Sequence, residues 1–168
     1  MKKNPPFCLL FFLLVLLSCK NNTTDNNSIS NSDEVAATSL LGKPLFASKP
    51  SAELLEKYNQ HKKAFDSAPY DVEKLIWYGR FTAYQGKYKE AISIFKKGIE
   101  QFPQDARLYR HRGHRYISIR QFDQAIADFE KAVELIQGKQ DEIEPDGIPN
   151  AQNIPVSTLQ GNIYYHLG

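Results

Sequence analysis

Two stretches of the chain repeat the same order of apolar and small residues at an offset of 34 positions. The matching pairs are Gly79 with Gly113, Tyr88 with Phe122, Ala91 with Ala125, Ile92 with Ile126, and Phe95 with Phe129. Within each stretch the apolar positions recur every three or four residues, which is the period of an amphipathic helix. A constant period of this length is typical of proteins built from stacked helical hairpins. The pattern therefore predicts two hairpins over residues 72–138, with a turn at Gly86 in the first.

Further elements are expected on both sides of the two hairpins. Residues 50–71 show helical spacing and predict a helix that caps the stack, with Ser51 as its N-cap. Residues 139–157 lose the periodicity and carry acidic residues and prolines, so we expect a loop whose acidic group is hydrated. Residues 158–168 restate the opening of a third repeat. We expect this repeat to be cut short because the sequence is a fragment of a longer protein, or its helix to be frayed.

The motifs of the second hairpin are specific enough to suggest a family. They read Tyr109-x-x-Arg112-Gly113-x-x-Tyr116, followed by Ala125-x-x-x-Phe129. This order resembles the tetratricopeptide repeat, whose pattern is Trp-x-x-Leu-Gly-x-x-Tyr, Ala-x-x-x-Phe and a closing proline. The resemblance implies an all-α fold, a solenoid of helical hairpins that coils as a right-handed superhelix. It also implies a concave groove lined by the first helix of each repeat.

Three positions depart from the family pattern. Thr82 replaces an aromatic residue, Arg112 replaces an apolar residue, and Arg120 replaces the glycine of the turn. Arg112 affects packing most, because a charged group is costly where two helices cross. Its stem can lie along apolar surface with the head in water, or its head can pair with Asp128.

The resemblance also implies which side chains face the groove. Counted along the three first helices, the predicted groove residues are Glu73, Ile76, Arg80 and Tyr84, then Arg107, Arg110 and His114, then Asn162 and Tyr165. The set is basic and aromatic, so an acidic protein or peptide segment would fit it. Alternatively, the arginines form a solvated face that is balanced by nearby carboxylates.

The N-terminus carries a second resemblance. Two lysines precede an apolar run over residues 7–17, and the small residue Ser18 stands directly before Cys19. The run is too short to cross a bilayer, which takes about 20 residues of helix. This order resembles the signal of bacterial lipoproteins and implies that residues 1–18 are removed and that Cys19 carries lipid, palmitate included. The alternative is an uncleaved anchor with a buried, inert cysteine.

Residues 19–49 are expected to be a disordered tether behind the lipidated cysteine. Its first twenty residues are rich in Asn, Ser, Thr and Asp and have almost no large apolar side chain, so they cannot bury enough surface to offset their ordering entropy. Lys20 follows the cysteine in place of the Asp that retains lipoproteins at the inner membrane of enteric bacteria. The bacterial cell envelope is thus the predicted location, with the outer membrane favoured.

Composition and residue spacing argue against several function classes. Without the signal the basic and acidic residues balance, which does not favour a nucleic-acid partner. His111 and His114 stand three apart but have no third ligand at matching spacing, so we expect surface histidines and no metal. No hydroxyl lies in a Gly-x-Ser-x-Gly context. We therefore expect no enzyme, no cofactor and no small-molecule substrate.

The resulting hypothesis is a membrane-tethered scaffold that mediates protein–protein interaction at the cell envelope. Two other hypotheses remain open at this point. One is a lipoprotein that assists envelope or outer-membrane assembly. The other is the N-terminal part of a longer enzyme or sensor, with its catalytic domain beyond residue 168.

Overall fold

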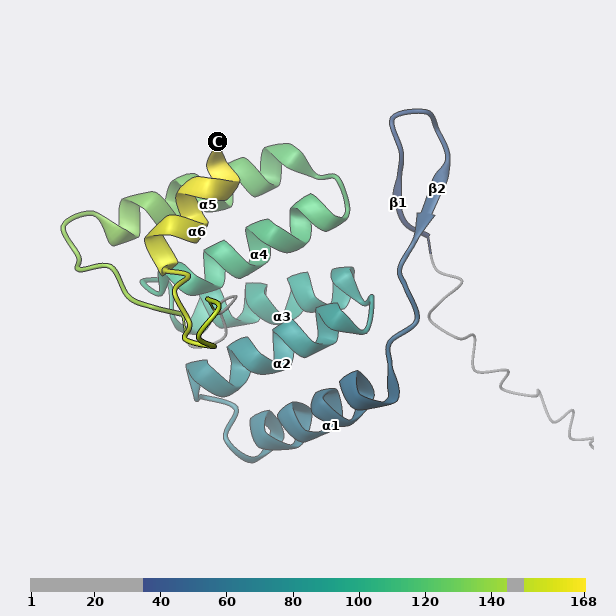
Figure 1. Ribbon diagram of the computed structural model, residues 1–168, viewed down its shortest axis with the longest axis horizontal. Helices are drawn as coiled ribbons and strands as arrows, with labels where there is room; N and C mark the ends of the chain where they lie inside the picture. The colour runs from purple at the N-terminus through teal and green to yellow at the C-terminus, as the bar shows by residue number, and fades with distance from the viewer. Residues whose placement is uncertain (1–34, 145–149) are drawn as a thin grey trace, which may run out of the picture.

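The computed structural model describes residues 35–144 and 150–168, which form two short strands and six helices (Figure 1). In chain order these are β1 Val35–Thr38, β2 Pro44–Phe46, α1 Ala52–Ser67, α2 Val72–Tyr84, α3 Tyr88–Gln101, α4 Ala106–Ser118, α5 Phe122–Ile136 and α6 Leu159–Leu167. Cys19 and the predicted signal 1–18 lie outside the described residues. Among the described helices, none combines the length and the apolar character that crossing a membrane requires.

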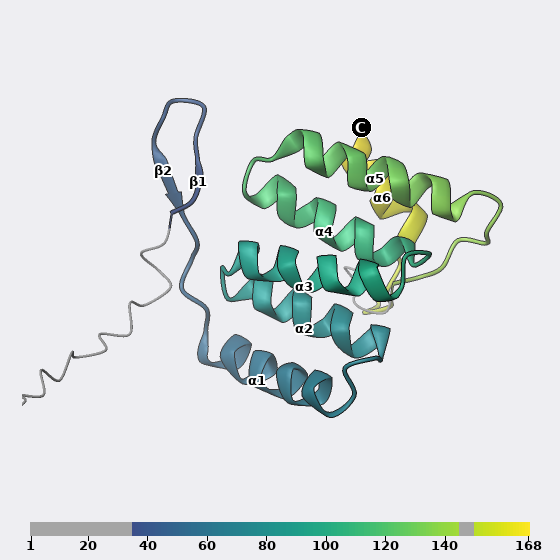
Figure 2. The same ribbon diagram turned by 180° about the vertical axis from the view of Figure 1, so that it is seen from behind.

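The six helices form one continuous stack. Each helix from α1 to α6 packs against the next one in sequence, as the two opposite views show (Figures 1 and 2). In addition, α2 contacts α4 and α4 contacts α6, so the first helices of successive hairpins are neighbours. This arrangement is a tetratricopeptide-like helical solenoid, and the predicted fold class is confirmed.

Side-chain caps start the helices that open the repeats. The carboxylate of Asp71 accepts a hydrogen bond from the backbone N–H of Lys74 at 3.2 Å, and that of Asp105 accepts one from Arg107 at 3.0 Å. The Ser51 hydroxyl caps α1 in the same way, as predicted. Each cap satisfies a backbone donor that the first turn of a helix leaves without a partner. The caps at positions 71 and 105 thus mark the starts of two equivalent repeats.

Small residues bring the paired helices close together. A Cβ atom added at Gly79 would lie 2.6 Å from Cζ of Phe95, and one added at Gly113 would lie 3.1 Å from Cζ of Phe129. Phe95 and Phe129 are almost fully buried. Each glycine therefore makes room for the aromatic ring of the facing helix, and the repeated pattern in the sequence reflects the same packing contact used twice.

Arg112 is accommodated by an ion pair between α4 and α5. Its Nε and one terminal nitrogen donate to the two carboxylate oxygens of Asp128 at 2.8 and 2.6 Å. The side chains of Arg112 and Asp128 are 17% and 7% exposed. Of the two alternatives considered from the sequence, the structure shows the pairing with Asp128.

Arg120 takes the backbone conformation of the glycine that it replaces. Its φ is 61°, in the left-handed region, and the equivalent Gly86 has a φ of 79°. The turn between the helices requires this conformation in both repeats. A side chain at this position costs conformational energy that glycine does not.

The expectation of a disordered tether over residues 19–49 is wrong for its described part. β1 and β2 pair antiparallel, and the turn between them is closed by hydrogen bonds between Ser39, Gly42 and Lys43. Ala37 is buried, and Ala36 shares a small hollow with Gly86 at the turn between α2 and α3. The composition argument missed this hairpin because it weighed side chains, whereas backbone hydrogen bonds and small residues hold the strands together.

Helix α6 packs onto the stack through α5 and α4. Ile163 of α6 is fully buried, in a cluster with Ala132, Leu135 and Ile136 of α5. Thr158 caps α6 through its hydroxyl and also forms a bridge to Ile143 in the preceding loop. The start of a third repeat is therefore a formed, packed helix rather than a frayed one.

Candidate functional site

A pocket of about 380 Å³ lies where the first helices of the two repeats, α2 and α4, meet α6. Its lining residues come from α2, α3, α4, α6 and the end of the loop before α6: Arg80, Tyr84, Phe95, Arg110, His111, His114, Arg115, Ser157, Asn162, Tyr165 and His166. Tyr84 and Tyr165 are the most accessible of them, at 42% and 81% exposure. The lining is basic and aromatic, as the sequence indicated.

Most of the predicted groove residues meet in this pocket, and three do not. The six that line it are Arg80, Tyr84, Arg110, His114, Asn162 and Tyr165. Ile76 is instead buried in the core between α2, α3 and α4. Glu73 and Arg107 lie outside the pocket lining and bind each other at the starts of α2 and α4.

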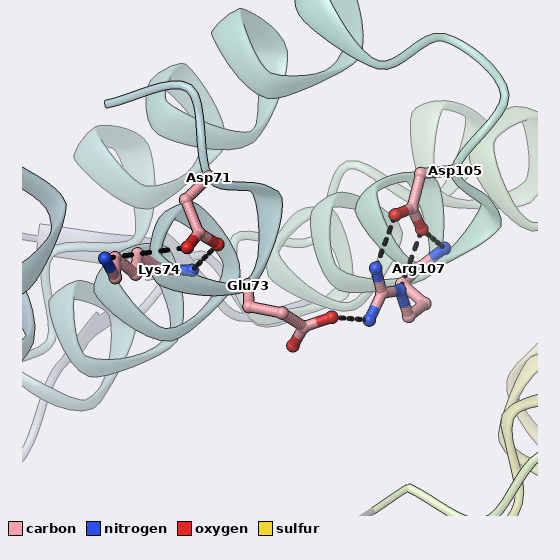
Figure 3. Close-up of polar contacts among 5 residues, drawn as sticks. All are labelled: Asp71, Glu73, Lys74, Asp105 and Arg107. Carbon is pink, nitrogen blue, oxygen red and sulfur yellow. Dashed lines mark hydrogen bonds and ion pairs between the residues drawn. The ribbon is translucent and has the colours of Figure 1, made fainter. Parts of the chain in front are cut away.

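Glu73 and Arg107 form a polar link between neighbouring repeats (Figure 3). The guanidinium of Arg107 also contacts both carboxylate oxygens of Asp105, with nitrogen–oxygen distances of 2.9 and 2.6 Å. These contacts, first of all the hydrogen bonds to Asp105, raise the pKa of Arg107. The donors of Arg107 are thus directed at this chain's own carboxylates rather than at the pocket.

Arg110 is held by a carboxylate from the loop that follows α5. Its guanidinium donates to Glu144 at 2.6 Å, and Glu144 also accepts a hydrogen bond from the Asn162 amide of α6. Glu144 is only 6% exposed. The expectation that the acidic group of this loop is hydrated is therefore wrong for Glu144, because a buried arginine lies within its reach.

Arg80 is oriented by two aromatic side chains of α2. Its guanidinium lies 4.5 Å from the centre of the Trp77 ring and donates to the hydroxyl of Tyr84 at 3.2 Å. The ring face attracts the cation, while the hydroxyl directs one of its N–H groups. These two contacts hold the Arg80 side chain along one wall of the pocket.

The three histidines that line the pocket pack against other rings. His111 is 6% exposed and stacks on Phe95 at 5.6 Å between ring centres, so the expectation of a surface histidine is wrong for it. His114 lies 4.5 Å from His166, again between ring centres. Burial, reinforced by nearby arginines, lowers the pKa of all three, and that of His114 falls to about 3. They are therefore neutral imidazoles near pH 7, and no group of metal ligands occurs among the described residues.

Sequence reasoning missed Arg115, which lines the pocket beside His114. Its side chain makes no hydrogen bond or ion pair with any residue in the described ranges. Burial lowers its pKa, and the neighbouring Arg110 and Arg80 add to this effect. The spacing of groove positions in the family skips this residue. The density of basic residues over 107–115 was the one available signal.

Comparison with known families agrees with the geometry of the second hairpin. The family model described as tetratricopeptide repeat matches residues 106–138, the segment that holds α4 and α5. No curated protein matches the chain significantly. Modules of this family generally bind proteins and do not catalyse reactions. Residues 106–138 thus form a tetratricopeptide repeat, within a stack in which α2 and α3 repeat its packing.

Proposed function

We propose that this protein is a membrane-tethered scaffold of the bacterial cell envelope, which captures a protein or peptide partner on the face shared by α2, α4 and α6. The observation that carries the proposal is the convergence of these helices on one pocket. Exposed Tyr84 and Tyr165 supply apolar contact area at its mouth. Aromatic side chains of this kind commonly anchor protein interfaces.

The arginines at the site favour a partner that brings acidic groups. Arg80 and Arg115 line the same pocket, and arginine forks bind carboxylates through paired hydrogen bonds. Arg107 and Arg110 already contact Glu73, Asp105 and Glu144. The partner's acidic groups are therefore expected at Arg115 rather than along the whole face.

The partner is best sought by photo-crosslinking in intact cells, with the photoreactive residue at position 165. Tyr164 offers a matched control, because it is the adjacent tyrosine and is 51% exposed but does not line the pocket. We expect a specific crosslinked protein from position 165 and none, or a different one, from position 164. Equal crosslinking from both positions would argue against capture at the pocket.

The membrane tether has its own test. In the proposal, Cys19 is lipidated after removal of residues 1–18, whereas Cys8 leaves with the signal. A single acyl chain binds membranes only reversibly, and two or three chains hold a protein firmly. We expect Cys19→Ser to abolish incorporation of labelled palmitate and to move the protein out of the outer-membrane fraction, while Cys8→Ser leaves both unchanged. Labelling that survives Cys19→Ser would refute the tether.

A further inference from the structure

Helix α4 carries four arginines, and three of them contact carboxylates of this chain. Arg107 contacts Asp105 and Glu73, Arg110 contacts Glu144, and Arg112 contacts Asp128. Figure 3 shows the first of these arrangements. Arg115 is the exception, because within the described ranges its side chain has no carboxylate and no hydrogen-bond acceptor.

The exception carries a cost for the ligand-free protein, because Arg115 is partly buried. An arginine remains charged at every physiological pH, so it cannot avoid burial of its charge by losing a proton. Removing a cation from water without a counter-charge costs several kcal/mol. The other lining arginines, Arg80 and Arg110, add positive potential and lower the pKa of Arg115 further. A cation retained under these conditions is a candidate binding group.

We propose that the pocket is a carboxylate-binding site in which the guanidinium of Arg115 holds the ligand. This goes beyond capture of a protein partner, since the ligand's carboxylate can belong to a small organic acid or to the end of a peptide. The planar fork of an arginine matches the two oxygens of a carboxylate. One arginine lacks a counter-charge, so a single negative charge is what the site requires.

The other lining groups suit the same ligand. His114 and His166 lie in contact and are uncharged near pH 7, so each offers a ring N–H to an anion without adding a competing charge. Ser157 and Asn162 also line the pocket and add a hydroxyl and an amide to it. A volume of about 380 Å³ is within the usual range of ligand pockets, roughly 300–1,000 Å³. A small carboxylic acid therefore fits with its apolar part against Tyr84 and Tyr165.

The test is calorimetric titration of the purified full-length protein with acetate, succinate, benzoate and inorganic phosphate. A short peptide is titrated in two forms, with a free and with an amidated C-terminus. The variants are Arg115→Gln, which removes the charge, Arg115→Lys, which keeps the charge without the fork, and Arg120→Gln as a control at an exposed arginine. Far-UV circular dichroism confirms that each variant is folded.

We expect at least one carboxylate to bind the wild type and Arg120→Gln equally. Its affinity should fall roughly tenfold or more in Arg115→Gln, the scale of a charged hydrogen bond, and by less in Arg115→Lys. Arg115→Gln should also be more stable than the wild type without ligand, which a merely structural arginine would not produce. Stronger binding of the free peptide than of its amidated form identifies a peptide end as the source, and equal or stronger binding of the small acids identifies a free acid.

Two results would overturn the assignment. One is that no carboxylate binds the wild type more tightly than it binds Arg115→Gln. The other is that inorganic phosphate binds more tightly than every carboxylate. Neither result would affect the crosslinking from position 165, so failure of this site remains distinguishable from failure of the proposed scaffold.

Discussion

The pair of Arg112 and Asp128 gives the sharpest test of how this repeat tolerates a charge between its helices. The two side chains are 17% and 7% exposed and are joined by two hydrogen bonds of 2.8 and 2.6 Å. The tetratricopeptide pattern has leucine at the position of Arg112. Replacing the arginine alone, the aspartate alone and both together therefore separates the cost of burying the charges from the benefit of pairing them.

The expected magnitudes follow from the burial of each group. Asp128→Ala leaves a largely buried guanidinium without its partner, and removal of one member of a buried pair costs about 3–5 kcal/mol. We expect about 3 kcal/mol, because Arg112 retains some contact with water. Arg112→Leu strands the more deeply buried Asp128 and should cost a similar amount. The double variant Arg112→Leu/Asp128→Ala should lie within about 1 kcal/mol of the wild type, since apolar replacements of buried pairs are often neutral.

Urea denaturation followed by far-UV circular dichroism measures these differences. With an m-value of about 1–3 kcal/mol per molar urea, a loss of about 3 kcal/mol lowers the midpoint by about 1–3 M. Lys131 and Glu134 form an exposed pair at 2.8 Å, so Glu134→Ala serves as a control with an expected change below about 1 kcal/mol. A double variant as unstable as Asp128→Ala would refute the reasoning, because the pair itself would then supply the lost stability and the cost would not come from a stranded charge.

Three further predictions concern packing, backbone strain and pH. Gly79→Ala should lower the free energy of unfolding more than Gly113→Ala, because its Cβ would meet a buried ring at 2.6 rather than 3.1 Å. Overpacking of this kind costs about 1–3 kcal/mol, and the urea midpoints of the two variants show which is less stable. Arg120→Gly should raise the free energy of unfolding by about 1 kcal/mol in the same assay, since its φ is 61°. His111 and His114 have lowered pKa values in the folded protein, so below about pH 6.5 they take up protons only in the unfolded chain. The free energy of unfolding should therefore fall by about 1.4 kcal/mol per pH unit for each histidine. Urea midpoints between pH 7.5 and 5.5 measure this loss.

The parts of the fold that follow from regular spacing could be predicted from the sequence. Gly79 and Phe95 recur as Gly113 and Phe129 because two helices must cross at the same distance in each repeat. Six of the nine groove residues implied by the resemblance to the tetratricopeptide repeat line the pocket. Ile76 is one of the three that do not, because its position in the core depends on how α3 and α4 pack around α2.

The partners of the charged residues could not be predicted in the same way. Glu144 stands in a loop without periodicity, so nothing in the sequence indicates that it folds back onto Arg110, 34 residues earlier. The burial of His111 and the position of Arg115 depend on where α6 and this loop cover α4. The hairpin of β1 and β2 was missed because its stability comes from backbone pairing and from contact with a distant turn.

The link between Glu73 and Arg107 has a consequence for how such an array can evolve. These residues occupy the same position in successive units but carry opposite charges (Figure 3). Tandem duplication of either unit would place two glutamates or two arginines against each other, and like charges in contact are unfavourable. The two units are consequently not interchangeable, and a change in copy number at this junction would require a compensating charge reversal.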